Sequence, residues 1–175
     1  MIFTETKLKG SFVIELEKIE DKRGFFARIW DKKKFEEHGL DSNFVQCSIS
    51  FSKKKGTVRG MHYQNVPHEE AKLIRCTKGK IFDVIIDLRP QSKTFKEWVG
   101  MELSDKNYKM LYAPKGFAHG FQTLVDNTEV FYQVSQYYMS DYSKGVRWND
   151  PAFGIKWILT PTVISKRDQS YTDFL

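Results

Sequence analysis

The sequence predicts an all-β protein, either a sandwich or a jelly-roll barrel. Short runs rich in Val, Ile, Phe and Tyr recur along the chain, and turn-forming residues at 21–24, 77–80 and 126–127 separate them. Many short strands at this spacing are typical of both architectures. The predicted strands span residues 11–17, 24–29, 44–51, 56–63, 71–77, 80–88, 98–103, 108–113, 120–124 and 128–138.

Two segments depart from the β pattern. Residues 31–38 are charged and contain few β-formers, and Gly39 can end a helix, so we expect a short surface helix there. From Tyr142 onward Pro151 and Pro161 interrupt the pattern, which predicts an irregular C-terminal segment. Because no repeat, low-complexity tract or linker is present, we expect a single domain over residues 1–175.

The composition indicates a globular protein with a preference for an anionic ligand. The chain has 175 residues, 41% hydrophobic and 15% aromatic, enough to build a core. Its net charge of +6 reflects a lysine-rich solvated surface and also favours an anionic substrate. The lysines are scattered and form no basic helix, which argues against a nucleic-acid partner.

The cysteines and the N-terminal residues suggest a cytoplasmic protein. Cys47 and Cys76 cannot make a disulfide framework and lack metal-ligand spacing. The N-terminal sequence becomes polar almost at once and has no apolar signal region, and no run approaches the length of a membrane span. We therefore expect reduced thiols and no membrane partner.

Two histidine-containing motifs are candidates for the functional site. RGMHYQ at residues 59–64 and PKGFAH at residues 114–119 resemble the two signature motifs of the cupin superfamily. Metal-binding cupins have a second histidine two residues after the first, where this chain has Gln64. Glu69 and Glu70 lie nearby, but stable transition-metal sites use three or four protein ligands. We therefore expect no metal and no cofactor.

Four residues carry the candidate chemistry, each with a structural alternative. His62 shares one side of its predicted strand with Gln64, and an inward-facing histidine can act as a general base near neutral pH or serve as a structural hydrogen-bonding group. Lys72 interrupts an apolar strand, so it lies at an exposed edge or pairs with an anion. Tyr132 fits core packing, and Asp168 fits a surface turn.

Several separated motifs together resemble the dTDP-4-dehydrorhamnose 3,5-epimerase family, and the resemblance covers essentially the whole chain. It implies a cupin-type antiparallel jelly-roll barrel that works without metal and forms homodimers in which site residues cross the interface. The motifs occur in the order RGFF at 23–26, RGMHYQ at 59–64, KLIRC at 72–76, PKGFAHGF at 114–121, WND at 148–150 and GIKW at 154–157.

The resemblance also implies roles for single residues. His62 matches the catalytic base and Asp168 the carboxylate paired with it, Lys72 matches the lysine that faces the sugar's carbonyl oxygen, and Tyr132 matches the proton donor on the opposite face of the ring. Arg59 matches a diphosphate contact, and Arg23 matches an arginine that reaches the ligand from the neighbouring subunit. The full predicted substrate-binding set is Arg23, Arg28, Gln46, Ser48, Arg59, His119 and Tyr138.

This set of groups suits proton chemistry next to a ketone. In a 4-keto sugar the protons on C3 and C5 are acidic, and removing either gives an enolate whose charge a fixed cation can stabilise. A histidine oriented by a carboxylate removes the proton, and a hydroxyl on the other face returns one. The resemblance thus implies an isomerase of dTDP-rhamnose and cell-surface polysaccharide biosynthesis, converting dTDP-4-dehydro-6-deoxy-D-glucose to dTDP-4-dehydro-L-rhamnose.

Some ligand-contact positions depart from the family pattern and leave alternatives open. Arg28 and Lys144 stand where better-known members tend to have an acid, and Cys47-Ser48 stands where they tend to have Asp-Asn. The alternatives are a mono-epimerase at C3 or C5 of another nucleotide ketosugar, such as a CDP-linked 3,6-dideoxy sugar, a nucleotide-sugar 3,4-ketoisomerase, and a non-catalytic sugar-binding cupin.

The direction of Arg59 is also open at this point. On an ideal strand Arg59 and His62 point to opposite sides, since side chains alternate. Either a bulge at Gly60 re-aims one of them, or the diphosphate crosses the strand at the mouth of the barrel.

Overall fold

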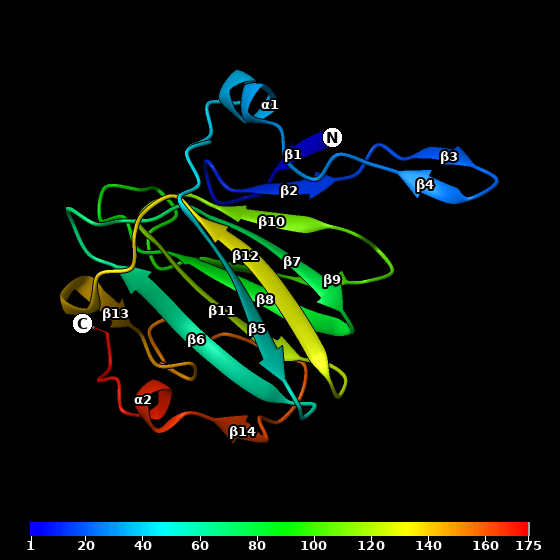
Figure 1. The fold of residues 1–175 in the computed structure, drawn as a ribbon. Helices are drawn as coiled ribbons and strands as arrows, with labels where there is room; N and C mark the ends of the chain where they lie inside the picture. The colour runs from blue at the N-terminus through cyan, green and yellow to red at the C-terminus, as the bar shows by residue number, and fades with distance from the viewer. Residues whose placement is uncertain (175) are drawn as a thin grey trace.

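Two antiparallel β-sheets lie face to face in the computed structural model, which describes residues 1–174 (Figure 1). This arrangement confirms the prediction of an all-β protein. The strands are β1 (Ile2–Glu5), β2 (Phe12–Glu15), β3 (Ile19–Asp21), β4 (Gly24–Phe26), β5 (Gln46–Ser52), β6 (Thr57–Gln64), β7 (Lys72–Lys78), β8 (Lys80–Asp87), β9 (Trp98–Ser104), β10 (Met110–Ala113), β11 (Phe117–Thr123), β12 (Thr128–Val134), β13 (Ser143–Gly145) and β14 (Val163–Ile164).

Each sheet interleaves strands from distant parts of the chain. The first sheet has the order β1-β2-β10-β7-β12-β5, and the second has the order β13-β6-β11-β8-β9, with β14 pairing parallel to β6. Strands β3 and β4 form a separate hairpin that stands away from the body (Figure 1). The central strand β7 places Ile74 and Cys76 between the sheets, as alternation predicts.

The core has three parts because three apolar surfaces must be covered. The central cluster between the sheets includes Ile74, Ile85 and Phe121. A second cluster covers the outer face of the first sheet, and a third, which includes Trp157 from the C-terminal segment, covers the outer face of the second sheet. Strands β8 and β11 are therefore buried almost throughout.

The predicted helix is confirmed as α1 (Lys32–Glu37). Asp31 caps it, because its side chain accepts a hydrogen bond from the Lys34 N–H at 3.3 Å. Its one buried residue, Phe35, packs edge-to-face on Tyr112 of β10. The helix thus holds the second cluster against the first sheet. Among residues 1–174, no helix is long and apolar enough to cross a membrane.

The prediction of an irregular C-terminal segment was wrong in part. Strands β13 and β14 and the one-turn helix α2 (Lys166–Gln169) lie in it. The strands have three and two residues, too short for a sequence pattern, and both form by pairing with β6. Strand β12 ends at Val134 and not at 138, and β11 begins at Phe117 and not at 120.

A bulge in β6 decides which side chains face the interior. His119 pairs with His62 and Phe121 pairs with Arg59, so the single residue Gly120 lies opposite two residues of β6. Arg59 and His62 consequently point to the same cavity, which confirms the first of the two expectations for Arg59. The bulge requires glycine at position 60, because φ is +123° and a Cβ there would lie 2.5 Å from the Gly120 Cα.

We predict that Gly60→Ala destabilises the protein by about 3–5 kcal/mol, because the methyl group meets both backbone strain and a fixed neighbouring backbone. Gly24→Ala is the matched control: Gly24 has the same φ of +123° but open space around its missing Cβ. It should cost only about 1–2 kcal/mol. Urea denaturation measures both, and equal losses would show that the contact with Gly120 contributes nothing.

Candidate active site

Two adjoining cavities open between the sheets. The first has a volume of about 480 Å³ and the second about 330 Å³. Their linings share His62, Lys72, Tyr132 and Arg167, so these four side chains stand at the junction. The first cavity adds Ser50, Thr57, Val58, Arg59, His119, Phe121, Val163, Ile164, Ser165 and Asp168, and the second adds Gln46, Ser48, Tyr63, Gln64, Glu70, Val134, Tyr138 and Ser143.

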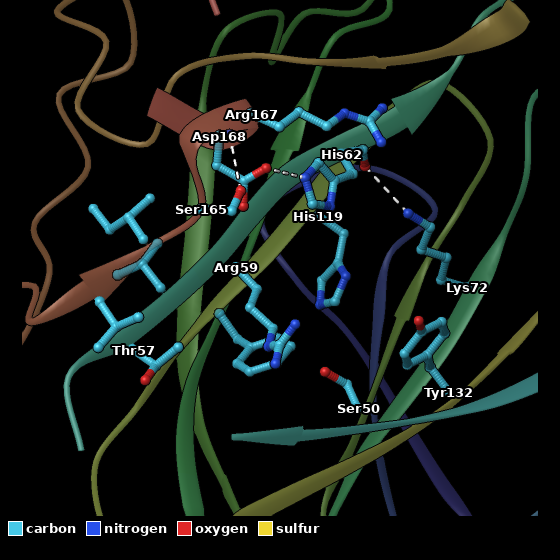
Figure 2. A pocket seen from close by; sticks show the side chains of 14 residues that line it. Ser50, Thr57, Arg59, His62, Lys72, His119, Tyr132, Ser165, Arg167 and Asp168 are labelled. Atoms are coloured by element: carbon cyan, nitrogen blue, oxygen red, sulfur yellow. Dashed lines mark hydrogen bonds and ion pairs between the residues drawn. The ribbon is translucent and has the colours of Figure 1, made fainter. Parts of the chain in front are cut away.

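His62 and Asp168 form the hydrogen-bonded pair that the sequence predicts. The His62 Nε2 lies 2.7 Å from the Asp168 Oδ1, as the dashed line in Figure 2 shows. Since a carboxylate accepts, this contact places the hydrogen on Nε2 and leaves the lone pair on Nδ1. The His62 side chain is 38% exposed and that of Asp168 only 5% exposed. The imidazole ring thus faces the cavity, and the Asp168 carboxylate lies behind it.

Asp168 is held as an anion by its surroundings. Burial alone would raise the pKa of Asp168, but hydrogen bonds from His62 and from the Gly60 N–H outweigh it and lower the pKa below its ordinary value of 3.8. Ser165 caps α2 by accepting from the Asp168 N–H at 3.0 Å. The expectation of a surface turn for Asp168 was therefore wrong, because α2 places its side chain against the bulge of β6.

Lys72 pairs with an anion, which resolves the alternatives left by its sequence. Strand β7 lies between β10 and β12, so Lys72 is not at a sheet edge. Its Nζ lies 2.9 Å from the Glu70 Oε1. It also donates to the His62 carbonyl oxygen at 3.2 Å, and Figure 2 draws this bond as a dashed line. The ammonium group is thus tied to the strand that carries the histidine.

Tyr132 faces His62 from the other sheet. It belongs to β12, whereas His62 belongs to β6, and both line the two cavities. Tyr132 also packs against the central cluster, so the expected core role is partly correct. Figure 2 shows the tyrosine beside Lys72 and across from the pair of His62 and Asp168. The junction can therefore hold a ligand between two proton-carrying groups.

A second histidine–carboxylate pair lies deeper. The His119 Nε2 is 2.7 Å from the Asp83 Oδ1, and Asp83 is fully buried. Burial raises the pKa of Asp83, although His119 opposes this shift. The pair fixes the His119 ring at the cavity wall.

Two arginines line the first cavity without a carboxylate partner among residues 1–174. Arg59 donates to the Ser52 hydroxyl at 3.0 Å and to the Phe51 carbonyl oxygen at 2.9 Å. Arg167 donates to the Ser143 hydroxyl at 2.8 Å and lines both cavities. The sequence analysis did not include Arg167 among the site residues. Its position next to Asp168 in the chain was the only feature of the sequence that could have indicated it.

Gln64 serves the structure of the loops around the cavity. Its side chain donates to the carbonyl oxygens of His68 and Tyr137 at 2.9 and 3.2 Å, and accepts from the Met139 N–H at 2.7 Å. Both ends of the amide are thus occupied. Among residues 1–174, no group of three or more His, Cys, Asp or Glu is arranged to hold a metal ion.

The structure brings most predicted binding residues together but leaves two outside. Gln46, Ser48 and Tyr138 line the second cavity. Arg23 lies on the exposed hairpin, paired with Asp21, and Arg28 pairs with Asp31 at 3.5 Å. Neither arginine lines either of these two cavities. Their roles as ligand contacts stay predictions.

We predict that Asp168→Asn lowers the free energy of unfolding by about 1–3 kcal/mol at pH 6, since it removes charged hydrogen bonds. Because the pKa of Asp168 is lowered on folding, this stabilisation is complete above the ordinary value of 3.8 and is lost as the pH falls through the lower folded value. The difference from wild type should therefore shrink below pH 4, measured by urea denaturation from pH 6 to pH 2.5. The exposed Asp141→Asn controls for the change in net charge, and a difference that stays constant with pH would contradict the expectation.

Comparisons with known proteins identify the family of this chain. A family model described as dTDP-4-dehydrorhamnose 3,5-epimerase matches residues 5–175. The chain is 40% identical over 171 residues to the dTDP-4-dehydrorhamnose 3,5-epimerase of Sinorhizobium fredii (strain NBRC 101917 / NGR234), covering 97% of this chain and 88% of that one.

Solved structures share the whole fold. The dTDP-4-dehydrorhamnose 3,5-epimerase from Bacillus anthracis str. Ames, with TDP and PPi bound, superposes with a TM-score of 0.95 at 42% identity over 99% of both chains. ChmJ, a 3'-monoepimerase from Streptomyces bikiniensis in complex with dTDP-quinovose, gives 0.88 at 25% identity over 96% of this chain and 85% of that one. These likenesses confirm the predicted cupin-type fold. The chain belongs to the dTDP-4-dehydrorhamnose 3,5-epimerase family of isomerases, which act on nucleotide-linked ketosugars.

Proposed function

We propose that this protein inverts C3 and C5 of dTDP-4-dehydro-6-deoxy-D-glucose to give dTDP-4-dehydro-L-rhamnose. The observation that carries the proposal is the junction of the two cavities, where His62 from one sheet faces Tyr132 and Lys72 from the other. Inversion at a carbon next to a ketone needs a base on one face, an acid on the other and a cation at the ketone oxygen.

His62 removes the proton in this scheme. The Asp168 carboxylate fixes the ring through Nε2, so Nδ1 receives the proton from the sugar carbon. The imidazolium that results is stabilised by the adjacent anion, which already carries a lowered pKa. The Gly60 N–H bonds the second carboxylate oxygen at 3.2 Å and keeps the carboxylate in place.

Lys72 and Tyr132 complete the reaction. Removing the proton moves negative charge to the C4 oxygen, and an ammonium group held in a partly dry site stabilises that charge as it develops. The Tyr132 hydroxyl then donates a proton to the opposite face of the carbon. Once His62 has released its proton to water and Tyr132 has taken one up from water, the same two steps at the other carbon flanking the ketone give the double inversion.

The nucleotide half of the substrate suits the arginines. Guanidinium groups bind phosphate oxygens in pairs, and Arg59 and Arg167 have no carboxylate partner among residues 1–174. The homologue from Bacillus anthracis has TDP and PPi bound. We extend that ligand class to this chain, with Gln46, Ser48 and Tyr138 of the second cavity as further contacts.

One alternative has a specific observation in its favour. ChmJ has the same fold and is a 3'-monoepimerase, so the fold serves single inversion as well as double inversion. Ser48, which stands at one of the departures from the family pattern, lines the second cavity. A changed contact there can alter how the sugar turns between the two steps.

A homodimer is the partner that we propose for this chain. The hairpin of β3 and β4 carries the exposed apolar side chains Ile19 and Phe26 together with Arg23. A second copy would cover these side chains and receive Arg23 near its own site. Sedimentation at micromolar concentration tests this, and a monomer would remove Arg23 from the site.

We predict that incubating the protein with dTDP-4-keto-6-deoxyglucose in deuterated water removes both the C3 and the C5 proton signals from the proton NMR spectrum. The sugar couplings should change to the rhamno form. Loss of one signal only would indicate a mono-epimerase. No exchange at either carbon would reject this substrate, and CDP-linked ketosugars would be tested next.

Tyr132→Phe sharpens the same experiment. Because Tyr132 lies opposite the base, this variant should retain deuterium exchange better than net inversion, by about tenfold or more. His62→Ala is the control that should lose both. Equal loss of exchange and inversion in Tyr132→Phe would contradict its role as the acid.

A further inference from the structure

The ion pair of Glu70 and Lys72 is unusual because it is nearly buried at the edge of the site. The Lys72 side chain is 9% exposed and the Glu70 side chain 11% exposed, with 2.9 Å between the Nζ and the Oε1. Removing two charges from water is costly, so such a pair is weak evidence for stability. Its place in the wall of the second cavity points to a role in the reaction instead.

The contacts of the ammonium group explain that role. A lysine ammonium has three N–H donors on a flexible stem. One donates to the His62 carbonyl oxygen at 3.2 Å, and the ammonium group forms an ion pair with the Glu70 Oε1 at 2.9 Å. Among residues 1–174 the ammonium group makes no other hydrogen bond, and Lys72 lines both cavities. These two contacts hold the ammonium group at the cavity wall, with donor capacity left for a ligand.

Glu70 is itself held in place by its neighbours. Gln64 bonds the His68 carbonyl oxygen at 2.9 Å, which fixes the turn that leads into Glu70. On the other side, the Ala71 N–H donates to the Ser135 hydroxyl at 2.9 Å. The carboxylate therefore sits on a braced segment between β6 and β7, as a positioning group must.

We propose that Glu70 is a positioning residue that orients the Lys72 ammonium group toward the ketone oxygen of the substrate and balances its charge before the substrate arrives. This inference rests on the proposed function, because it assigns Glu70 to the lysine that stabilises the enolate. Glu70 acts through Lys72 and need not touch the sugar. Its loss should weaken stabilisation of the transition state more than binding of the ground state.

The test is a double-mutant cycle on kcat. Glu70→Gln keeps the size of the side chain and one acceptor oxygen but removes the charge. It should lower kcat about tenfold to a hundredfold, while KM changes less than threefold. This loss is smaller than the roughly 10²–10³-fold loss of kcat expected when a donor to an oxyanion is itself removed. In a Lys72→Met background the same substitution should change kcat less than twofold, because there is no ammonium left to orient. Equal fold-losses in both backgrounds would overturn the proposal.

Glu69→Gln is the matched control, because it removes the same charge one residue earlier and Glu69 lines neither cavity. It should leave kcat and KM within twofold of wild type. If Glu69→Gln lowered kcat as much as Glu70→Gln does, the effect would come from the change in net charge and not from the position of Glu70.

A second measurement does not depend on the substrate. In protein labelled with ¹⁵N-lysine, the Lys72 ammonium signal, assigned by its absence in Lys72→Met, should exchange slowly with water in wild type and at least tenfold faster in Glu70→Gln. Unchanged exchange would show that Glu70 does not hold the ammonium, whatever the substrate. Absence of turnover in wild type, together with the expected change in exchange, would reject the proposed substrate and leave the positioning role intact.

Discussion

The close approach of Gly60 and Gly120 is the constraint on which the site depends. Because neither residue has a side chain, β6 can bulge against β11, and two residues of β6 fit opposite one. The bulge turns Arg59 to the side of the sheet where His62 lies. It also presents the Gly60 N–H to Asp168, which is 108 residues away in the sequence. A backbone irregularity thus gathers His62, Asp168 and Arg59 at one cavity.

The charged groups of the cavity wall follow a simple division. His62, Lys72 and His119 each have a carboxylate partner, namely Asp168, Glu70 and Asp83. In a partly dry wall such pairing keeps each group in one orientation. Arg59 and Arg167, in contrast, bond only to hydroxyl and carbonyl oxygens among residues 1–174. The paired groups suit proton transfer on a neutral sugar ring, and the two arginines leave positive potential for a diphosphate.

Gln64 has a structural role at a position where metal-binding cupins have a ligand. It stands where metal-binding cupins have a second histidine, and its side chain lines the second cavity. All three of its hydrogen bonds go to the main chain of two loops, at His68, Tyr137 and Met139. These loops lead to Glu70 and carry Tyr138, so the amide holds the main chain that borders the second cavity.

The sequence by itself determined the all-β class, most of the strands and the helix after Asp31, and its motifs singled out His62, Lys72 and Tyr132, which the structure places in one site. Those features depend on local alternation, capping and motif spacing, which the order of residues contains directly. Only the tertiary structure decided the strands β13 and β14, the partnership of Glu70 with Lys72, and the place of Arg167 at the junction of the cavities. Strands of two or three residues have no periodicity to detect, and these two form because β6 offers them a partner. Likewise, the direction of Arg59 depends on the contact of two glycines 60 residues apart, which no local pattern of β6 encodes.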